Sequence, residues 1–207
     1  MKKIPTLFKR TFDDRHRIVA ITDELTDPAF KCCLNGGAVP TVKIDGACCA
    51  IIGGELYKRY DAKKGKNPPA GAIPCQDAPD AITGHWPHWA KCDESNPEDK
   101  WFFAAFEDYI NFDKYKAEQL KSGELDGTYE AIGKHFNGNP YGFETCDTLE
   151  KHGNILISCE FASFEEIKQY LRDTRIEGIV FWKDGEPLCK IKRSDFGFEW
   201  PVKRPLS

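Results

Sequence analysis

The chain has 207 residues, with 41% hydrophobic and 30% charged residues and a net charge of −4. This composition is too apolar for a disordered chain and indicates a soluble globular protein of one large or two small domains. The sequence has no apolar run long enough to span a bilayer, and its first residues lack the apolar core of a signal peptide. The acidic balance does not predict a nucleic-acid partner, which would need a local basic patch.

The nine cysteines indicate a reducing environment. They include the adjacent pairs Cys32–Cys33 and Cys48–Cys49, and their total is odd. Because adjacent cysteines rarely bridge each other, we expect free thiols and a cytoplasmic or nuclear location.

Strand-like runs dominate the chain and two helices interrupt them, which predicts an α+β fold. Asn96, followed by Pro97 and two acids, is typical of a helix start. Ser163 with Glu166 three residues later forms a capping box, which predicts a second helix. The strand-like runs are residues 16–22, 40–52, 128–133, 154–159, 178–182 and 187–192.

Residues 61–97 are rich in proline and lysine and predict a long irregular segment, either a functional loop or a surface insertion. Trp86 and Trp89 are expected to anchor this segment to the core rather than to stack on unpaired bases. The cysteines and histidines of this segment could also form a zinc site. Their spacing matches no standard zinc finger, so we expect thiols and histidines without a metal. The candidate zinc ligands are Cys75, His85, His88 and Cys92.

Three lysines stand where strand patterns predict regular, partly buried structure. Lys43 lies inside the apolar strand-turn-strand pattern of residues 39–52, directly before an Asp-Gly turn signal. The turn "KDGE" makes a hairpin of the last two strand-like runs, so that Lys190 and Lys192 project from one face. A lysine among other cations loses its proton more readily and becomes a nucleophile, and clustered lysines neutralise phosphate. These residues suggest attack of Lys43 on the α-phosphate of a nucleotide, assisted by a divalent metal.

The segment "KIDG" at residues 43–46 resembles motif I (KxDG) of the covalent nucleotidyltransferases, the superfamily of ATP-dependent DNA and RNA ligases and mRNA capping enzymes. Four further segments resemble the later motifs in the same order: motif Ia at Arg59, motif III at Glu130, motif IV at Glu177 and motif V in "KIK" at 190–192. Five ordered motifs are a stronger signal than KxDG alone. The segments "IDGACC", "NGNPYG" and "FGFEWP" are similar to segments of the vertebrate-type 5′-to-3′ RNA ligase family.

The resemblance implies a single adenylyltransferase domain over residues 1–207, without a C-terminal OB-fold. Its fold would be α+β, with two antiparallel sheets, flanking helices and the nucleotide in the cleft between the sheets. It implies ATP and Mg²⁺ or Mn²⁺ as cofactors, and RNA with 5′-phosphate and 3′-hydroxyl ends as the substrate. It suggests neither a membrane nor a protein partner.

The resemblance also implies a role for each motif residue. Lys43 would carry the adenylate, with Asp45 and Gly46 shaping the turn that presents it. Lys190 and Lys192 would grip the α-phosphate as the other catalytic residues.

The remaining motif residues would bind the nucleotide and metal. Arg59 would contact the ribose or the RNA 5′-phosphate, Glu130 would hold the ribose hydroxyls, and Glu177 would orient a metal-bound water; both acids are candidate metal ligands. Phe161 is the best candidate to stack on adenine. Val42 departs from the family pattern, since many RNA ligases have a glutamate directly before the nucleophile.

Two alternatives remain open at the level of sequence. One is a DNA ligase or a GTP-using covalent nucleotidyltransferase, and the other is a non-catalytic RNA-binding module with a degenerate ligase pocket. The loop "NGNPYG" is either a tight connector or a wall of the nucleotide pocket. A basic run is interpreted as a phosphate-binding patch rather than a solvated loop: Lys58, Arg59, Lys63, Lys64 and Lys66.

Overall fold

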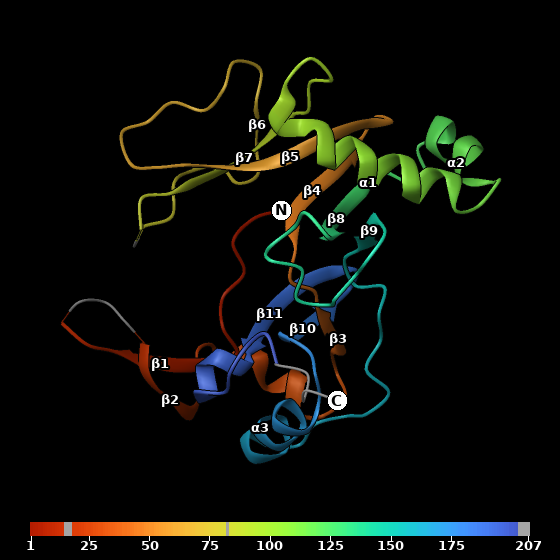
Figure 1. The fold of residues 1–207 in the computed structure, drawn as a ribbon. Helices are drawn as coiled ribbons and strands as arrows, with labels where there is room; N and C mark the ends of the chain where they lie inside the picture. The colour runs from red at the N-terminus through yellow and green to blue at the C-terminus, as the bar shows by residue number, and fades with distance from the viewer. Residues whose placement is uncertain (15–17, 82, 203–207) are drawn as a thin grey trace. The chain divides into compact units, whose positions relative to one another are not determined.

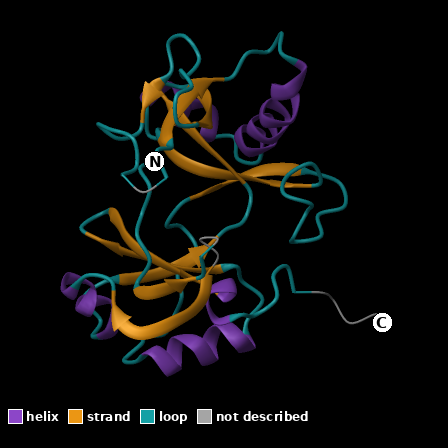
Figure 2. Cartoon of the chain, turned by 90° about the vertical axis from the view of Figure 1, so that its left-hand side faces the viewer, coloured by secondary structure: helices purple, strands orange, loops and turns teal. Residues whose placement is uncertain are grey.

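The computed structural model describes residues 1–14, 18–81 and 83–202. Within these residues it contains eleven strands, three α-helices and three short 3-10 helices, which confirms an α+β protein dominated by strands (Figures 1 and 2). Backbone contacts divide the chain into two compact units. Unit 1 consists of Met1–Lys3 and Asp45–His152, and unit 2 consists of Ile4–Ile44 and the chain from Gly153 onward.

Unit 1 is built on one six-stranded antiparallel sheet with the order β6-β7-β5-β4-β8-β9. One face of the sheet packs against two helices and forms an apolar core that includes Ile51, Tyr129 and Leu149. The elements are β4 (Ala47–Ile52), β5 (Glu55–Ala62), β6 (Ile73–Pro74), β7 (Trp86–Lys91), β8 (Gly127–Gly133), β9 (Asp147–Lys151), α1 (Lys100–Asn111) and α2 (Lys116–Ser122).

The predicted helix start at Asn96 is confirmed. The Asn96 side chain accepts a hydrogen bond from the Glu98 N–H at 3.1 Å, and the first turn, η2 (Pro97–Asp99), is a 3-10 helix that leads into α1. Ala105 of α1 is fully buried in the unit 1 core. The capping side chain and the apolar face therefore position α1 against the sheet.

Unit 2 contains a three-stranded antiparallel sheet, order β11-β10-β3, and the hairpin β1-β2. Ile167 and Leu171 of the helix α3 are fully buried in the same core as Ile179 and Ile191 of the sheet. Ser163 caps α3 by accepting a hydrogen bond from Glu166 N–H at 3.2 Å, as predicted. The elements are β1 (Phe8–Phe12), β2 (Ile18–Leu25), η1 (Pro28–Leu34), β3 (Val39–Lys43), α3 (Phe164–Asp173), β10 (Gly178–Lys183), β11 (Glu186–Lys192) and η3 (Arg193–Phe196).

Two predictions about the strands are wrong. The described residues form three sheets rather than two, because β1 and β2 pair separately from the others. Residues 154–159 are not a strand: only Leu156 bridges to Thr41, while the backbones of Ile155 and Ile157 hydrogen-bond to the edge of β3. The apolar run Ile155–Leu156–Ile157 lies beside this edge strand without forming a continuous ladder.

The segment 61–97 is more ordered than predicted, although residue 82 lies outside the described residues. It contains β6 and β7, and β7 pairs with β5 over six residues. Trp89 is 7% exposed, and the Trp86 indole N–H donates to the Gln76 carbonyl at 2.8 Å, so the predicted anchoring role is confirmed. Of the strand predicted at 16–22, residues 16 and 17 lie outside the described residues and the rest belongs to β2.

No helix in the described parts of the chain has the length and apolar character needed to cross a bilayer. The assignment to a ligase-type adenylyltransferase fold, and to a single domain over residues 1–207, stays a prediction.

Candidate active site

The sheet of unit 2 brings Lys43 and Lys192 onto one face. Lys43, the last residue of β3, stands opposite Gly178 of β10, and Gly178 stands opposite Lys192 of β11. Directly opposed residues project from the same face, so the two lysines flank a position without a side chain. A Cβ atom at Gly178 would lie 2.2 Å from the Ile191 carbonyl oxygen, so only glycine fits there.

Glu177 links the two lysines. Its carboxylate oxygen Oε2 lies 2.5 Å from Lys43 Nζ, and Oε1 lies 2.9 Å from Lys192 Nζ. Glu177 is only 6% exposed, whereas the side chains of Lys43 and Lys192 are 18% and 31% exposed. One buried carboxylate therefore contacts two partly exposed ammonium groups. Its single negative charge balances only one of the two positive charges.

Lys190 lies on the same side of β11 as Lys192, because residues two apart in a strand share a face. Its backbone is fixed by the N-terminal segment: Lys190 N–H donates to Pro5 O at 3.0 Å, and Lys190 O accepts from Leu7 N–H at 2.8 Å. The hairpin predicted for "KDGE" is confirmed, with positive φ at Asp184 and Gly185. The face thus brings together Lys43, Lys190 and Lys192 with the carboxylate of Glu177, and clustered lysines suit a phosphate.

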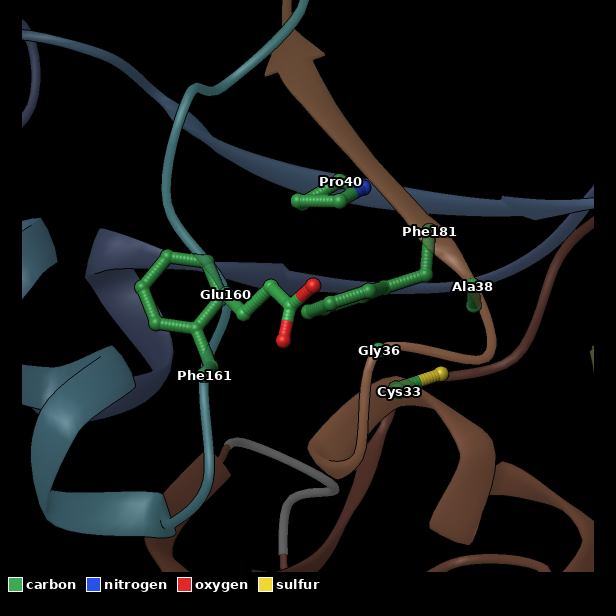
Figure 3. A pocket seen from close by; sticks show the side chains of 7 residues that line it. All are labelled: Cys33, Gly36, Ala38, Pro40, Glu160, Phe161 and Phe181. Carbon is green, nitrogen blue, oxygen red and sulfur yellow. The ribbon is translucent and has the colours of Figure 1, made fainter.

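Val42 and Phe161 belong to the apolar side of unit 2. Val42 is adjacent to Lys43 in β3 and packs against the core. Phe161 is 4% exposed and makes edge contacts with Tyr170 and Phe181, at centroid distances of 5.2 and 6.2 Å. It lines the small pocket in Figure 3 beside Glu160. This packing gives Phe161 a core role, and its contact with adenine stays a prediction.

The other motif residues lie in unit 1, where Arg59 and Glu130 flank Cys48 on one face of the sheet. Cys48 of β4 stands opposite Glu130 of β8, and its thiol contacts Arg59 of β5. Burial, and then the charge of Glu130, raise the pKa of the Cys48 thiol to about 12. His152 Nε2 lies 3.2 Å from Glu130 Oε1, and Arg59 is ion-paired with Asp61 at 3.0 Å.

The turn at Asp45 and Gly46 is held by the loop "NGNPYG". Asn137 Nδ2 donates to Asp45 Oδ1 at 3.0 Å and to the Gly46 carbonyl at 2.6 Å, while the Asp45 N–H donates to the Tyr141 hydroxyl at 2.6 Å. A Cβ atom at Gly46 would lie 2.3 Å from the Ala131 carbonyl oxygen. The loop is therefore more than a connector, because its side chains fix the turn that follows Lys43.

Four residues of these sites are not predicted from the sequence: Asn137, Tyr141, Cys48 and His152. The turn residues of "NGNPYG" gave the only signal for the first two. Cys48 and His152 gave no signal, because their proximity to Glu130 depends on strand pairing.

The predicted basic patch is partly neutralised. Lys58 is ion-paired with Asp99 and Arg59 with Asp61, so two of its five cations already have acidic partners. The remaining members, Lys63, Lys64 and Lys66, lie in exposed positions. The phosphate-binding role of this run stays a prediction.

The donor atoms distinguish two kinds of metal site. Glu177 offers a carboxylate beside cations that attract phosphate, and Mg²⁺ is usually bound by one or two carboxylates together with substrate phosphates, so Glu177 fits this ion. Glu130 is close to sulfur and nitrogen donors from Cys48 and His152, which suit a transition metal rather than Mg²⁺.

The four residues considered as an alternative zinc site, Cys75, His85, His88 and Cys92, do not form a comparable cluster among the described residues. His88 Nδ1 instead lies 2.9 Å from the Trp86 carbonyl oxygen.

Comparisons with known proteins agree with the resemblance found in the motifs. A family model described as RNA ligase 1 matches residues 71–206. RNA ligase 1 of Danio rerio is 32% identical over 143 residues, which cover 58% of this chain and 43% of that protein. RNA ligase 1 of Pongo abelii is 24% identical over 229 aligned residues, which cover 80% of this chain and 69% of that protein.

The chain thus spans less than half the length of the Danio rerio relative and about two thirds of the Pongo abelii relative. The range matched by the family model contains Glu130, Glu177 and the lysines of β11. This range is well over half of the chain, so the chain belongs to the RNA ligase 1 family.

Proposed function

We propose that this chain is an ATP-dependent RNA ligase that joins an RNA 5′-phosphate to a 3′-hydroxyl through a lysyl-AMP intermediate. The observation that carries the proposal is the contact of Glu177 with both Lys43 and Lys192, at 2.5 and 2.9 Å. Strand pairing in unit 2 assembles these residues from three separate motifs. The arrangement presents a partly exposed amine beside further cations, as attack on a phosphate requires.

In the first step the Lys43 amine attacks the α-phosphorus of ATP. A nitrogen–phosphorus bond forms, the bond to the β-phosphate oxygen breaks, and pyrophosphate leaves. An ammonium group has no lone pair with which to attack, so the Lys43 proton must first be removed. Glu177 Oε2 is placed to accept it. Lys190 and Lys192 offset the charge that develops on the α-phosphate oxygens.

In the second step an oxygen of the RNA 5′-phosphate attacks the phosphorus of the bound AMP and releases Lys43. In the third step the RNA 3′-hydroxyl attacks the activated 5′-phosphate, the strand is sealed and AMP leaves. A divalent ion, Mg²⁺ or Mn²⁺, would be held by Glu177 together with phosphate oxygens and would supply additional charge neutralisation.

Unit 1 would bind the nucleotide and the RNA end. We assign the ribose hydroxyls to Glu130, and the ribose or the RNA 5′-phosphate to Arg59. Both residues lie on the polar face of the sheet, which supports these roles. Asn137 and Tyr141 support the assignment of Asp45 and Gly46, because they fix the turn directly after Lys43.

The test is incubation with α-labelled ATP and Mg²⁺, followed by a denaturing gel and intact mass. Wild type and the control Lys31→Ala, which removes an exposed lysine at the end of η1, should gain one AMP, and Lys43→Ala should gain none. Labelling by GTP instead of ATP would favour a GTP-using enzyme. Absence of an adduct at all pH values and metals tested would overturn the proposal and favour an RNA-binding module.

A second assay identifies the substrate. The wild-type protein should seal 5′-phosphorylated RNA ends, and Lys43→Ala should not. Sealing of DNA nicks with no sealing of RNA would show that the chain acts as a DNA ligase.

A further inference from the structure

Three potential metal ligands converge on the polar face of the unit 1 sheet. Cys48 of β4 stands opposite Glu130 of β8. His152 follows β9 directly and extends its pairing, because the His152 N–H donates to the Thr128 carbonyl at 3.0 Å. One donor atom from each side chain lies within 4.8 Å of the other two. The strands β4 and β8 and the residue that follows β9 therefore bring a sulfur, an oxygen and a nitrogen close together.

The imidazole of His152 is already oriented by a second partner. Its Nδ1 lies 2.9 Å from the Thr128 hydroxyl, and its Nε2 lies 3.2 Å from Glu130 Oε1. A histidine that binds a metal almost always donates its other ring N–H to a neighbouring oxygen, which fixes its tautomer and orientation. Thr128 is placed to fill this role and leaves Nε2 directed toward Glu130.

Glu130 has an oxygen atom in need of a partner. The residue is only 9% exposed, and its Oε2 is buried without a hydrogen bond in the structure. A buried carboxylate oxygen without a partner is costly, and such atoms are rare in folded proteins. A bound cation would satisfy this oxygen.

We propose that Cys48, Glu130 and His152 form a binding site for a zinc-type transition-metal ion. Zinc bonds of about 2.0–2.3 Å place tetrahedral donors roughly 3.3–3.6 Å apart. The Nε2–Oε1 distance of 3.2 Å is close to this value, and the Cys48 sulfur, which lies within 4.8 Å of the other two donors, would need to approach them by no more than about 1.2 Å. Three protein ligands leave the fourth position to water or to a substrate oxygen.

The site has a consequence for catalysis that rests on the function proposed above. Glu130 is the residue assigned to the ribose hydroxyls, so a metal ion bound to it would compete with the nucleotide. Zinc should therefore inhibit formation of the AMP adduct, while Mg²⁺, which binds nitrogen and sulfur poorly, supports it.

The test uses Co²⁺, whose absorption reports a bound thiolate, on the full chain. Wild type should take up one ion with a thiolate-to-cobalt band that Zn²⁺ abolishes, and the exposed-cysteine control Cys159→Ser should match it. Cys48→Ser should lose the band, and Glu130→Gln should bind Co²⁺ at least tenfold more weakly. Circular dichroism of each variant is used to check that it folds as the wild type does. Absence of the band in wild type, or its persistence in Cys48→Ser, would overturn the proposal.

This readout does not depend on ligase activity. A cobalt band that requires Cys48 supports the site even if the protein forms no AMP adduct. Conversely, an adduct in a protein that gives no band would leave the proposed function standing and overturn the metal site.

Discussion

Replacing Glu177 by glutamine tests whether its carboxylate is the common counter-charge of Lys43 and Lys192. Glutamine keeps the shape of the side chain and removes its charge. The two ammonium groups, at 2.5 and 2.9 Å from the carboxylate in the structure, would then face each other without an acid between them. We expect Glu177→Gln to lower the free energy of unfolding of unit 2.

The size of the effect follows from burial and distance. At an effective dielectric constant of about 20, two opposite charges roughly 3 Å apart attract each other by about 5 kcal/mol. Desolvation of the carboxylate cancels part of this, and removal of one partner of a buried ion pair typically costs about 3–5 kcal/mol. Because the Lys192 side chain is 31% exposed, solvent screens its contribution. We therefore expect a loss of about 2–4 kcal/mol.

Scanning calorimetry measures this loss. For a chain of this size about 1 kcal/mol lowers the Tm by roughly 2–4 °C, so the transition of unit 2 should fall by roughly 5–15 °C. The control is Glu165→Gln, which removes an exposed acid at 3.4 Å from Lys168 on α3 and should change the Tm by less than about 2 °C. A Tm for Glu177→Gln equal to that of the control would refute the assignment of Glu177 as the counter-charge.

Two further substitutions and one chemical modification have defined outcomes. Gly178→Ala places a Cβ 2.2 Å from the Ile191 carbonyl and should cost about 1–3 kcal/mol in thermal unfolding; an unchanged Tm would contradict the steric argument. Asn137→Ala removes two hydrogen bonds and should accelerate amide exchange at Asp45, by an amount equivalent to about 1–3 kcal/mol. Burial and Asp99 raise the pKa of the Cys92 thiol to about 12, so alkylation at pH 8 should be fast only after unfolding, as followed by mass spectrometry.

The features that were predicted from the sequence are mostly local. A capping side chain acts on an N–H two or three residues away, so Asn96 and Ser163 located their helices correctly. The hairpin between β10 and β11 was also predicted, since its turn needs two residues with positive φ and has an Asp-Gly pair.

The features that were missed depend on pairing between distant segments. A buried strand and a segment that lies beside a strand edge can both contain a short apolar run, which is why residues 154–159 were assigned wrongly. Likewise, Cys48 and Glu130 become neighbours only through the register of β4 and β8. The motif resemblance located Lys43 and Glu177 without this information, but the residues that surround them needed the structure.

The segments "KIDG" and "EGIV" each contain a glycine that has no reactive group, and the structure gives a steric reason for it. Gly46 follows Lys43 by three residues, and Gly178 follows Glu177 directly. A Cβ at either position would lie within 2.3 Å of a backbone carbonyl oxygen, at Ala131 or Ile191 respectively. Since backbone atoms cannot move aside as a flexible side chain does, an alanine would displace the backbone at the glycine and, through the chain, the charged residue that precedes it. The glycines therefore position the charged residues, and substituting either should reduce formation of the AMP adduct although neither has a group that takes part in it.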